Sequence, residues 1–283
     1  MNVPPRPDLS PSPAGRPPRR SFGSVLIVLG LIGILGASAV ALSRMRERPA
    51  RESADARAAP TPDATRTVVP DAPAGSATFR FLERSKGKGP WRFDPCGEIP
   101  YVTNLDEAPR GALADLKSAV GALEAASGLR FDYEGRTDEV ARPTRALYQP
   151  GRYGERWAPL LVDWHDPKTS LFDWRVSDEG PLALGLASPR WSPRDPGVYV
   201  SGVIALNARD RGPRGFAWPW SRGVTMLHEL GHAVGLAHVH ARDEIMSTDG
   251  RSTATAYGQG DLAGLARLGA DAGCLSPPPL PDR

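Results

Sequence analysis

Hydrophobic residues form one unbroken block near the start of the chain and a patterned region behind it. Residues 22–42 (FGSVLIVLGLIGILGASAVAL) are almost all apolar, and no residue between Arg20 and Arg44 is charged. A helix of about 21 residues spans roughly 30 Å, the thickness of the hydrocarbon core of a bilayer. A core helix of a soluble protein would not be apolar on every face, so the pattern predicts that this segment enters lipid.

Two fates of residues 22–42 stay open. The run is longer than the apolar core of a typical signal peptide, and Arg44, Arg46 and Arg48 follow it like a stop signal. Both features favour a retained single-pass anchor in the cell membrane. Arginines flank both of its ends, so the orientation rests on the disulfide expected of Cys96 and Cys274, which favours the following domain outside the cell. Small residues at 37–41 (ASAVA) instead resemble a signal-peptidase site, and cleavage there would make the protein secreted.

Composition divides the rest of the chain. Residues 1–21 are rich in proline and arginine and are predicted to be a disordered cytoplasmic tail. Residues 43–78 contain few large apolar residues and are predicted to be a disordered Pro/Ala-rich linker. Residues 79–275 are predicted to form one folded domain, since about 190 residues suffice for a well-buried core. Residues 276–283 are predicted to be a second disordered tail.

Within residues 79–275 the hydrophobic period alternates between strand and helix. A helix is predicted at 109–127, where leucine and valine recur at helical spacing, and Gly128 is placed to end it. The β-rich runs are residues 99–104, 129–133, 159–164 and 198–208. This order of strand, helix, further strands and a late helix predicts an α/β fold with a mixed, mostly parallel sheet.

The net charge and the distribution of arginines do not indicate a further class of partner. The formal net charge is +3 over 283 residues, and arginines are scattered through loops such as 142–156 without forming a continuous stripe. This distribution is typical of a solvated surface, so we expect no nucleic-acid partner. We also expect the protein to be a monomer.

The two cysteines, Cys96 and Cys274, lie at opposite ends of the predicted domain. Behind a membrane or export segment, this placement favours one disulfide in an oxidising compartment. Two buried free thiols are the alternative.

Residues 225–240 (TMLHELGHAVGLAHVH) contain the pattern H-E-x-x-H-x-x-G-x-x-H, filled by His228, Glu229, His232, Gly235 and His238. Two histidines four residues apart project from one face of a helix, so both imidazoles can reach one metal ion. Gly235 can adopt a positive φ and end the helix, after which the chain turns back and brings in His238. Three protein ligands leave a position for water, which is typical of a catalytic zinc. Glu229 is then placed as a general base.

The motif resembles that of the metzincins, and its surroundings resemble the matrixins among them. Residues 244–247 (EIMS) are similar to the Met-turn, in which Met246 would lie beneath the zinc. Residues 184–187 (LGLA) resemble the strand that lines the matrixin cleft, and residues 91–102 (WRFDPCGEIPYV) resemble the start of bacterial matrixin-like domains. The resemblance is strongest over residues 225–247.

The sequence also departs from the matrixins. They usually hold a second, structural zinc through additional histidines, but Ser188 stands where one is expected, and His165 is the one histidine outside the motif region. We therefore expect a single zinc, and no residue pattern supports a calcium site, which is left open. His240 follows the motif but is predicted not to be a ligand. Tyr257 lies too far along the chain to match the tyrosine of some metzincins, and we expect it to pack.

A cysteine switch is a further alternative that the resemblance raises. Pro95-Cys96-Gly97 faintly resembles the matrixin switch, in which a thiolate on the zinc keeps the enzyme latent. This role and a disulfide to Cys274 exclude each other.

The resemblance implies an α/β (α+β zincin) domain of the metzincin type that acts as a zinc-dependent endopeptidase. Its peptide or protein substrate would bind extended along an edge strand near residues 182–188. Two alternatives stay open: a catalytically silent, membrane-anchored binding module with this fold, and a zinc hydrolase with a non-protein substrate.

Overall fold

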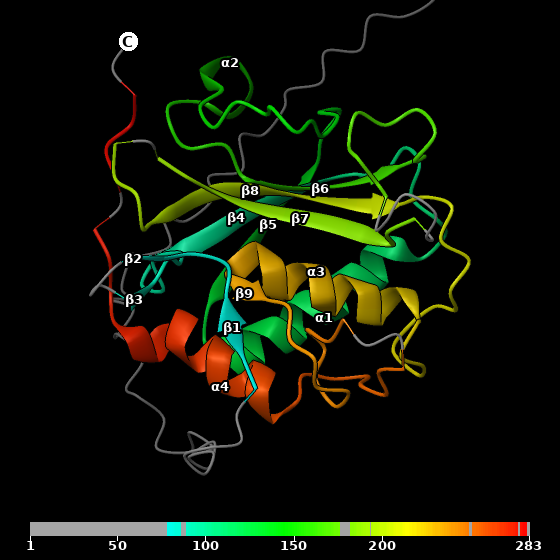
Figure 1. Cartoon of the computed structure of the whole chain (residues 1–283). Coiled ribbons are helices and arrows are strands. Elements are labelled where there is room, and N and C mark those ends of the chain that lie inside the picture. The colour runs from blue at the N-terminus through cyan, green and yellow to red at the C-terminus, as the bar shows by residue number, and fades with distance from the viewer. Residues whose placement is uncertain are drawn as a thin grey trace, which may run out of the picture. The chain divides into compact units, whose positions relative to one another are not determined.

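The patterned region of the sequence forms a five-stranded sheet with helices packed on one face (Figure 1). The computed structural model describes residues 78–85, 89–175, 182–192, 194–248, 251–276 and 278–281. These residues lie in one of the two compact units of the chain, Thr67–Arg283. The predicted tail 1–21, the apolar segment 22–42 and all but the last residue of the predicted linker 43–78 lie outside the described residues. Within the described part of the chain, no helix is long and apolar enough to cross a membrane.

The sheet is mixed and mostly parallel, as predicted. Its strands are β4 (Glu98–Asn104), β5 (Arg130–Arg136), β6 (Leu160–His165), β7 (Gly185–Trp191) and β8 (Tyr199–Asn207). The spatial order is β5-β4-β6-β8-β7. The β4–β5, β4–β6 and β6–β8 pairs are parallel, and only the edge strand β7 pairs antiparallel, with β8.

Burial follows from the position of each strand in the sheet. Every residue of the central strand β6 is buried, and so is nearly all of β8. Such continuous apolar runs are typical of strands covered on both faces. On the edge strand β5, Phe131 and Tyr133 are half-buried while their neighbours are exposed, which explains the alternation in its sequence. All four strand regions expected from the sequence are therefore confirmed.

Two long helices, α1 and α3, lie side by side against one face of the sheet, and α4 packs beyond them (Figure 1). The helices are α1 (Ala112–Ser127), α2 (Pro150–Tyr153), α3 (Arg222–Val234) and α4 (Gln259–Leu268), followed by a 3₁₀ turn at Ala270–Ala272. Helix α1 begins three residues later than the predicted range 109–127. It ends as expected at Gly128, which has a φ of 69°.

Two short antiparallel pairs complete the described strands. β1 (Arg80–Phe81) pairs with β9 (Leu236–Ala237), and β2 (Arg84–Ser85) pairs with β3 (Gly89–Pro90). In Figure 1, β1 and β9 lie beside the end of α3 and next to α4. The first described residues of the domain therefore contact the segment that follows the predicted metal-binding helix.

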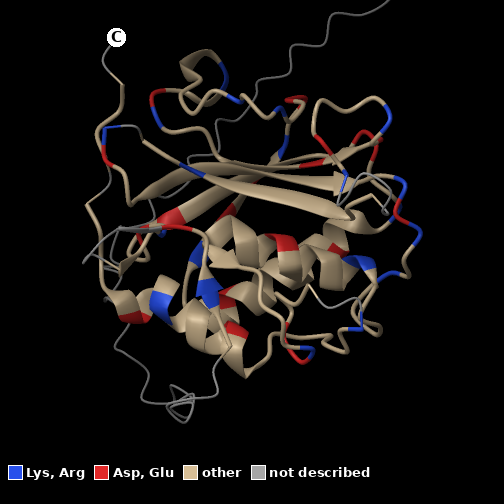
Figure 2. Ribbon diagram, in the orientation of Figure 1, with Lys and Arg blue, Asp and Glu red and all other residues tan. Residues whose placement is uncertain are grey.

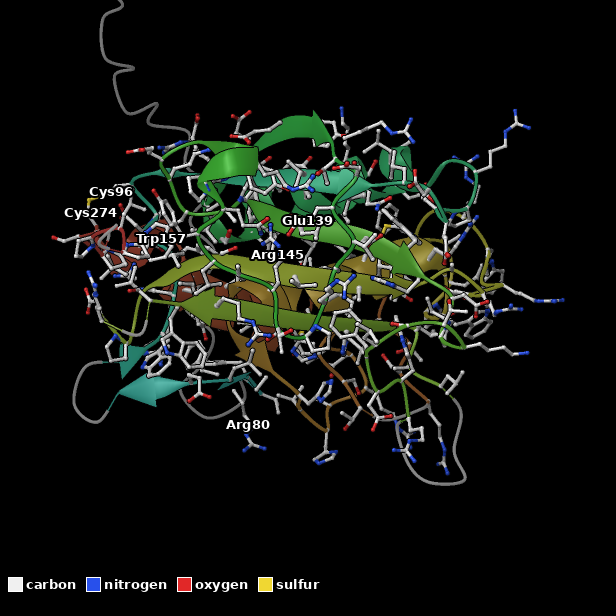
Figure 3. All side chains as sticks on the ribbon, turned by 90° about the horizontal axis from the view of Figure 1, so that it is seen from above. Arg80, Cys96, Glu139, Arg145, Trp157 and Cys274 are labelled. Atoms are coloured by element: carbon white, nitrogen blue, oxygen red, sulfur yellow. A yellow bond between two sulfur atoms is a disulfide. The ribbon has the colours of Figure 1, made fainter. Side chains whose placement is uncertain are left out.

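The opposite face of the sheet is covered by the loop between β5 and β6. Arg145 and Glu139 form an ion pair of 2.8 Å over this face (Figure 3), and both side chains are almost completely buried. The Arg145 guanidinium also donates to the Pro159 carbonyl at 2.9 Å and the Ser201 hydroxyl at 3.0 Å. The sequence interpretation treated the arginines of 142–156 as solvated, which is wrong for Arg145. This guanidinium anchors the loop to the sheet.

Charged residues in the described part of the chain are interspersed, with Lys and Arg positions lying among Asp and Glu positions along the ribbon (Figure 2). Cys96 and Cys274 form a disulfide, with a Cα–Cα distance of 5.3 Å and a sequence separation of 178 (Figure 3). The predicted disulfide is thus confirmed. With its sulfur in this bond, Cys96 is not free to act as the thiolate of a cysteine switch.

Candidate metal centre

The three motif histidines converge because helix α3 ends between the second and the third. His228 and His232 lie one turn apart on α3, which ends at Gly235. The φ of Gly235 is 121°, a conformation that favours glycine, and a side chain there would also meet the Trp91 carbonyl at 3.0 Å. The chain then reverses through β9 and brings His238 back toward the helix. Sequence reasoning predicted this helix end correctly.

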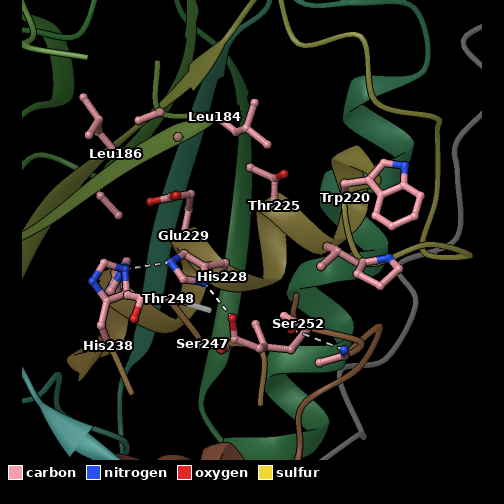
Figure 4. Close-up of a pocket in the computed structure, with 18 of the residues that line it drawn as sticks. Leu184, Leu186, Trp220, Thr225, His228, Glu229, His238, Ser247, Thr248 and Ser252 are labelled. Atoms are coloured by element: carbon pink, nitrogen blue, oxygen red, sulfur yellow. Dashed lines mark hydrogen bonds between the residues drawn. The ribbon is translucent and has the colours of Figure 1, made fainter. Parts of the chain in front are cut away.

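The Nε2 atoms of the three imidazoles point at one another, in an arrangement that could hold a metal ion. The Nε2 atoms of His228 and His238 are 3.0 Å apart, and those of His232 and His238 are also 3.0 Å apart (Figure 4). Nitrogens bound to one tetrahedral zinc at 2.0–2.1 Å would be separated by about 3.3 Å. The triad therefore fits a zinc ion with only small adjustments, and three ligands leave one position open.

Backbone carbonyls orient two of these imidazoles. His228 Nδ1 donates to the Ile245 carbonyl at 2.7 Å, and His232 Nδ1 donates to the Leu236 carbonyl at 2.8 Å. Since each Nδ1 carries the proton, each Nε2 presents its lone pair to the metal position. Burial lowers the pKa of His228 to about 4 and that of His232 to about 3. Both rings are thus neutral at pH 7, the form that binds a metal.

Glu229 lies next to the triad in a buried position beneath the start of β7. The space above it is available because residue 185 is glycine. A Cβ at Gly185 would lie 2.5 Å from the Glu229 Cγ and 2.7 Å from its Oε1. Burial raises the pKa of the Glu229 carboxyl to about 8. A cation on the three imidazoles would lower this pKa again, because a nearby positive charge favours the carboxylate.

Met246 packs beneath the helical turn that carries two of the histidines. It is 1 % exposed, and a Cβ at Gly231 would lie 2.5 Å from its Sδ. The Met246 carbonyl accepts the Val239 N–H at 3.0 Å, so this turn is tied to the residue after His238. The segment expected to resemble a Met-turn therefore lies directly under the triad.

Two acidic residues, Glu244 and Asp261, hold this turn in place. The sequence analysis did not single out Asp261. The Asp261 carboxylate accepts the N–H groups of Ile245 at 2.5 Å and Met246 at 3.3 Å. Glu244 accepts the N–H groups of Gly260 and Asp261, both at 2.7 Å, at the start of α4. Burial raises the pKa of Asp261 to about 7, although its backbone donors act in the opposite direction. In the sequence, Asp261 could have been singled out as an aspartate in the first turn of α4, a position where acidic residues are favoured.

The remaining singled-out residues lie outside the triad. His240 is exposed, and its Nδ1 lies 3.0 Å from the Thr248 Oγ1. The Tyr257 hydroxyl donates to the Leu227 carbonyl at 2.9 Å, which is a packing role. His165 lies on β6 with its Nε2 3.0 Å from an Asp163 oxygen. Ser188 lies on the edge strand β7.

A cleft of about 730 Å³ passes over the triad. Leu186 of β7 and Leu184, just before this strand, border one side. Ser247 and Thr248 border the other, with Trp220 at one end (Figure 4). His228, Glu229 and His238 lie on its floor between these walls. An extended chain lying along β7 would therefore pass across the metal position.

No known family model matches this chain, and no curated protein matches it. Its function is therefore inferred from the chemistry and geometry of the site.

Proposed function

We propose that this protein is a zinc-dependent endopeptidase with a metzincin catalytic domain, most similar to the matrixins. The observation that supports this most directly is the convergence of three imidazoles on one point, with Glu229 beside them on the floor of an open cleft. A zinc that only stabilised the fold would have four protein ligands in a closed site. A three-histidine site facing a cleft is typical of a catalytic metal.

His228, His232 and His238 would hold the ion. Bound there, zinc supplies Lewis-acid activation of the attacking water and the scissile carbonyl. Glu229 accepts a proton from that water and passes it to the leaving amine. Burial keeps bulk water away from this carboxylate, so the proton is transferred between groups held in place.

The free edge of β7 offers backbone groups to a peptide. The Asn207 N–H donates to the Leu184 carbonyl at 2.9 Å, and the register of β7 with β8 is unbroken as far as Arg190. Hydrogen-bonded and non-hydrogen-bonded pairs alternate in an antiparallel ladder. The N–H and C=O groups of Gly185 and Ala187 therefore face away from β8. A substrate that adds a strand here would bond to these two residues.

Pro189 limits how far such a strand can extend. By the same alternation its nitrogen faces the free edge, but proline carries no N–H. The edge therefore offers donors at Gly185 and Ala187 and none at residue 189. The sheet beyond this point also carries a register shift, between Arg190 and Trp191. We therefore expect backbone recognition of a short stretch of substrate that lies close to the metal position.

The decisive measurement combines metal analysis with peptide hydrolysis. The purified chain should contain one zinc, cleave peptides from a mixed library, and lose activity with a chelator. Activity on esters or sugars without peptide cleavage would favour the alternative of a hydrolase with a non-protein substrate.

Glu229→Gln separates an enzyme from a silent binding module. The amide cannot accept a proton, so turnover should fall by roughly 10²–10⁴-fold, the usual effect of losing a general base. Zinc content and peptide binding should remain, because the three histidines and the β7 edge are unchanged. A variant that retains most of its peptidase activity would contradict the assigned role of Glu229.

A further inference from the structure

The segment that carries the third histidine leaves helix α3 and so loses the hydrogen bonds of the helix. Only Leu236 and Ala237 separate Gly235 from His238, and His238 is exposed. On one side, the chain after His238 is bound to the Met246 turn through Val239. On the other side its neighbour is β1, from the very start of the described domain (Figure 1).

β1 is hydrogen-bonded to this segment between the second and third histidines. Phe81 lies opposite Leu236, and Arg80 lies opposite Ala237. The Leu82 N–H donates to the Gly235 carbonyl at 2.9 Å. Leu236 in turn accepts the His232 Nδ1–H at 2.8 Å through its carbonyl. The residue that orients one imidazole is therefore itself positioned by β1.

Side-chain packing fixes β1 against the protein. A Cβ at Gly264 of α4 would lie 2.7 Å from a Leu236 methyl and 3.1 Å from the Phe79 Cβ, so both side chains press against this helix. The Phe81 ring is 5.4 Å from the Phe79 ring and packs on the core cluster. Arg80, between them, points outward (Figure 3). The segment thus has two anchoring side chains and one that is solvated.

We propose that residues 79–82, here called the N-terminal clamp, are positioning residues for the metal site. The clamp holds the Gly235–His238 turn so that the Leu236 carbonyl orients His232 and the third imidazole returns to the metal position. This inference rests on the proposed zinc site. Partners that orient metal ligands without touching the ion typically change metal affinity by about 10–100-fold when they are lost.

Leu82→Pro and Leu82→Ala, in the full-length chain, form a matched test. Proline removes the N–H that donates to the Gly235 carbonyl, whereas alanine retains it and removes only the side chain. Zinc affinity, measured by competition with a chromophoric chelator, should fall roughly 10–100-fold in Leu82→Pro. It should stay close to the wild-type value in Leu82→Ala. Equal affinities in the two variants would overturn the proposal.

The visible spectrum of the cobalt-substituted protein distinguishes positioning from general destabilisation. Cobalt(II) absorption reports the geometry of the ligands, so Leu82→Pro should change its intensity and band positions. Loss of global stability alone would lower the melting temperature and leave the spectrum of the folded fraction unchanged, and this result too would overturn the proposal.

Phe81 offers a second route if the proline variant does not fold. Phe81→Ala should weaken zinc binding and alter the cobalt spectrum, Phe81→Leu should restore both, and Arg80→Ala should change neither. Wild-type zinc affinity in Phe81→Ala would refute the clamp. A wild-type chain that binds no zinc would instead refute the proposed function, so the two failures are distinguishable.

Discussion

Gly185 on the edge strand lies directly against Glu229 on helix α3, and a Cβ at position 185 would be 2.5 Å from the glutamate Cγ. The proposed base and the proposed substrate edge are therefore in van der Waals contact. Any side chain at 185 would force the Glu229 side chain to shift, even though the strand backbone alone would accept other residues.

Gly185→Ala should displace the Glu229 carboxylate and leave the histidines in place. A misplacement of about 1 Å in a reacting group can reduce turnover by roughly 10²-fold, and we expect a loss of this order with zinc content unchanged. Gly121→Ala is the matched control, because a Cβ there meets nothing within 4 Å. Full peptidase activity in Gly185→Ala would show that the contact does not position the base.

Removal of any triad imidazole should lower zinc occupancy severely. His228→Ala, His232→Ala and His238→Ala each leave two ligands, too few for a stable zinc site. His240→Ala should retain about one zinc per chain, because His240 bonds to Thr248 outside the triad. Metal content per chain by elemental analysis checks this. Full occupancy without His238, or two zinc ions per wild-type chain, would contradict the ligand assignment.

Ala187→Pro tests the recognition of peptide backbone by β7. The substitution removes one outward-facing N–H without breaking the ladder with β8. One hydrogen bond contributes about 0.5–1.5 kcal/mol, so kcat/KM should fall roughly two- to twelvefold. Ala187→Ser, which retains the N–H, is the control. Unchanged kcat/KM in the proline variant would argue against strand addition at this edge.

Asp261→Ala should destabilise the turn beneath the triad. It leaves the buried N–H groups of Ile245 and Met246 without their carboxylate acceptor. Each unsatisfied buried donor costs about 1–3 kcal/mol, so the free energy of unfolding should fall by at least about 2 kcal/mol in denaturant titrations. Asp132→Ala, at an exposed position on β5, should have little effect. Equal stability of the two variants would exclude this role for Asp261.

The Cys96–Cys274 disulfide should contribute to stability and not to chemistry. A bridge that closes so long a loop contributes roughly 4–5 kcal/mol in the chain-entropy description. The double variant Cys96→Ser/Cys274→Ser should therefore unfold at lower denaturant concentration while its folded form retains zinc and activity. An increase in activity on Cys96→Ser would instead revive the latency role.

The sequence by itself determined the local parts of this protein. Histidines four residues apart on a helix, a glycine that ends that helix, and a third histidine three residues later all follow from backbone geometry within one short segment. The central strands β6 and β8 could also be predicted from the sequence, because strands buried on both faces must be apolar along their whole length. The half-exposed edge strand β5 was predicted shorter than it is, since polar side chains weaken the strand pattern there.

Tertiary structure alone decided which backbone carbonyls orient the triad and which distant residues press against it. The carbonyls of Ile245 and Leu236 orient two imidazoles, but every residue carries a carbonyl, so no side chain marks them in the sequence. Gly185 contacts Glu229, more than forty positions further along the chain. Phe81 pairs with Leu236, more than one hundred and fifty positions further along. Hydrophobic periodicity reports which face of an element is buried and not which distant element covers it. The ligands are therefore local in the sequence, whereas their orientation depends on contacts that exist only in the folded chain.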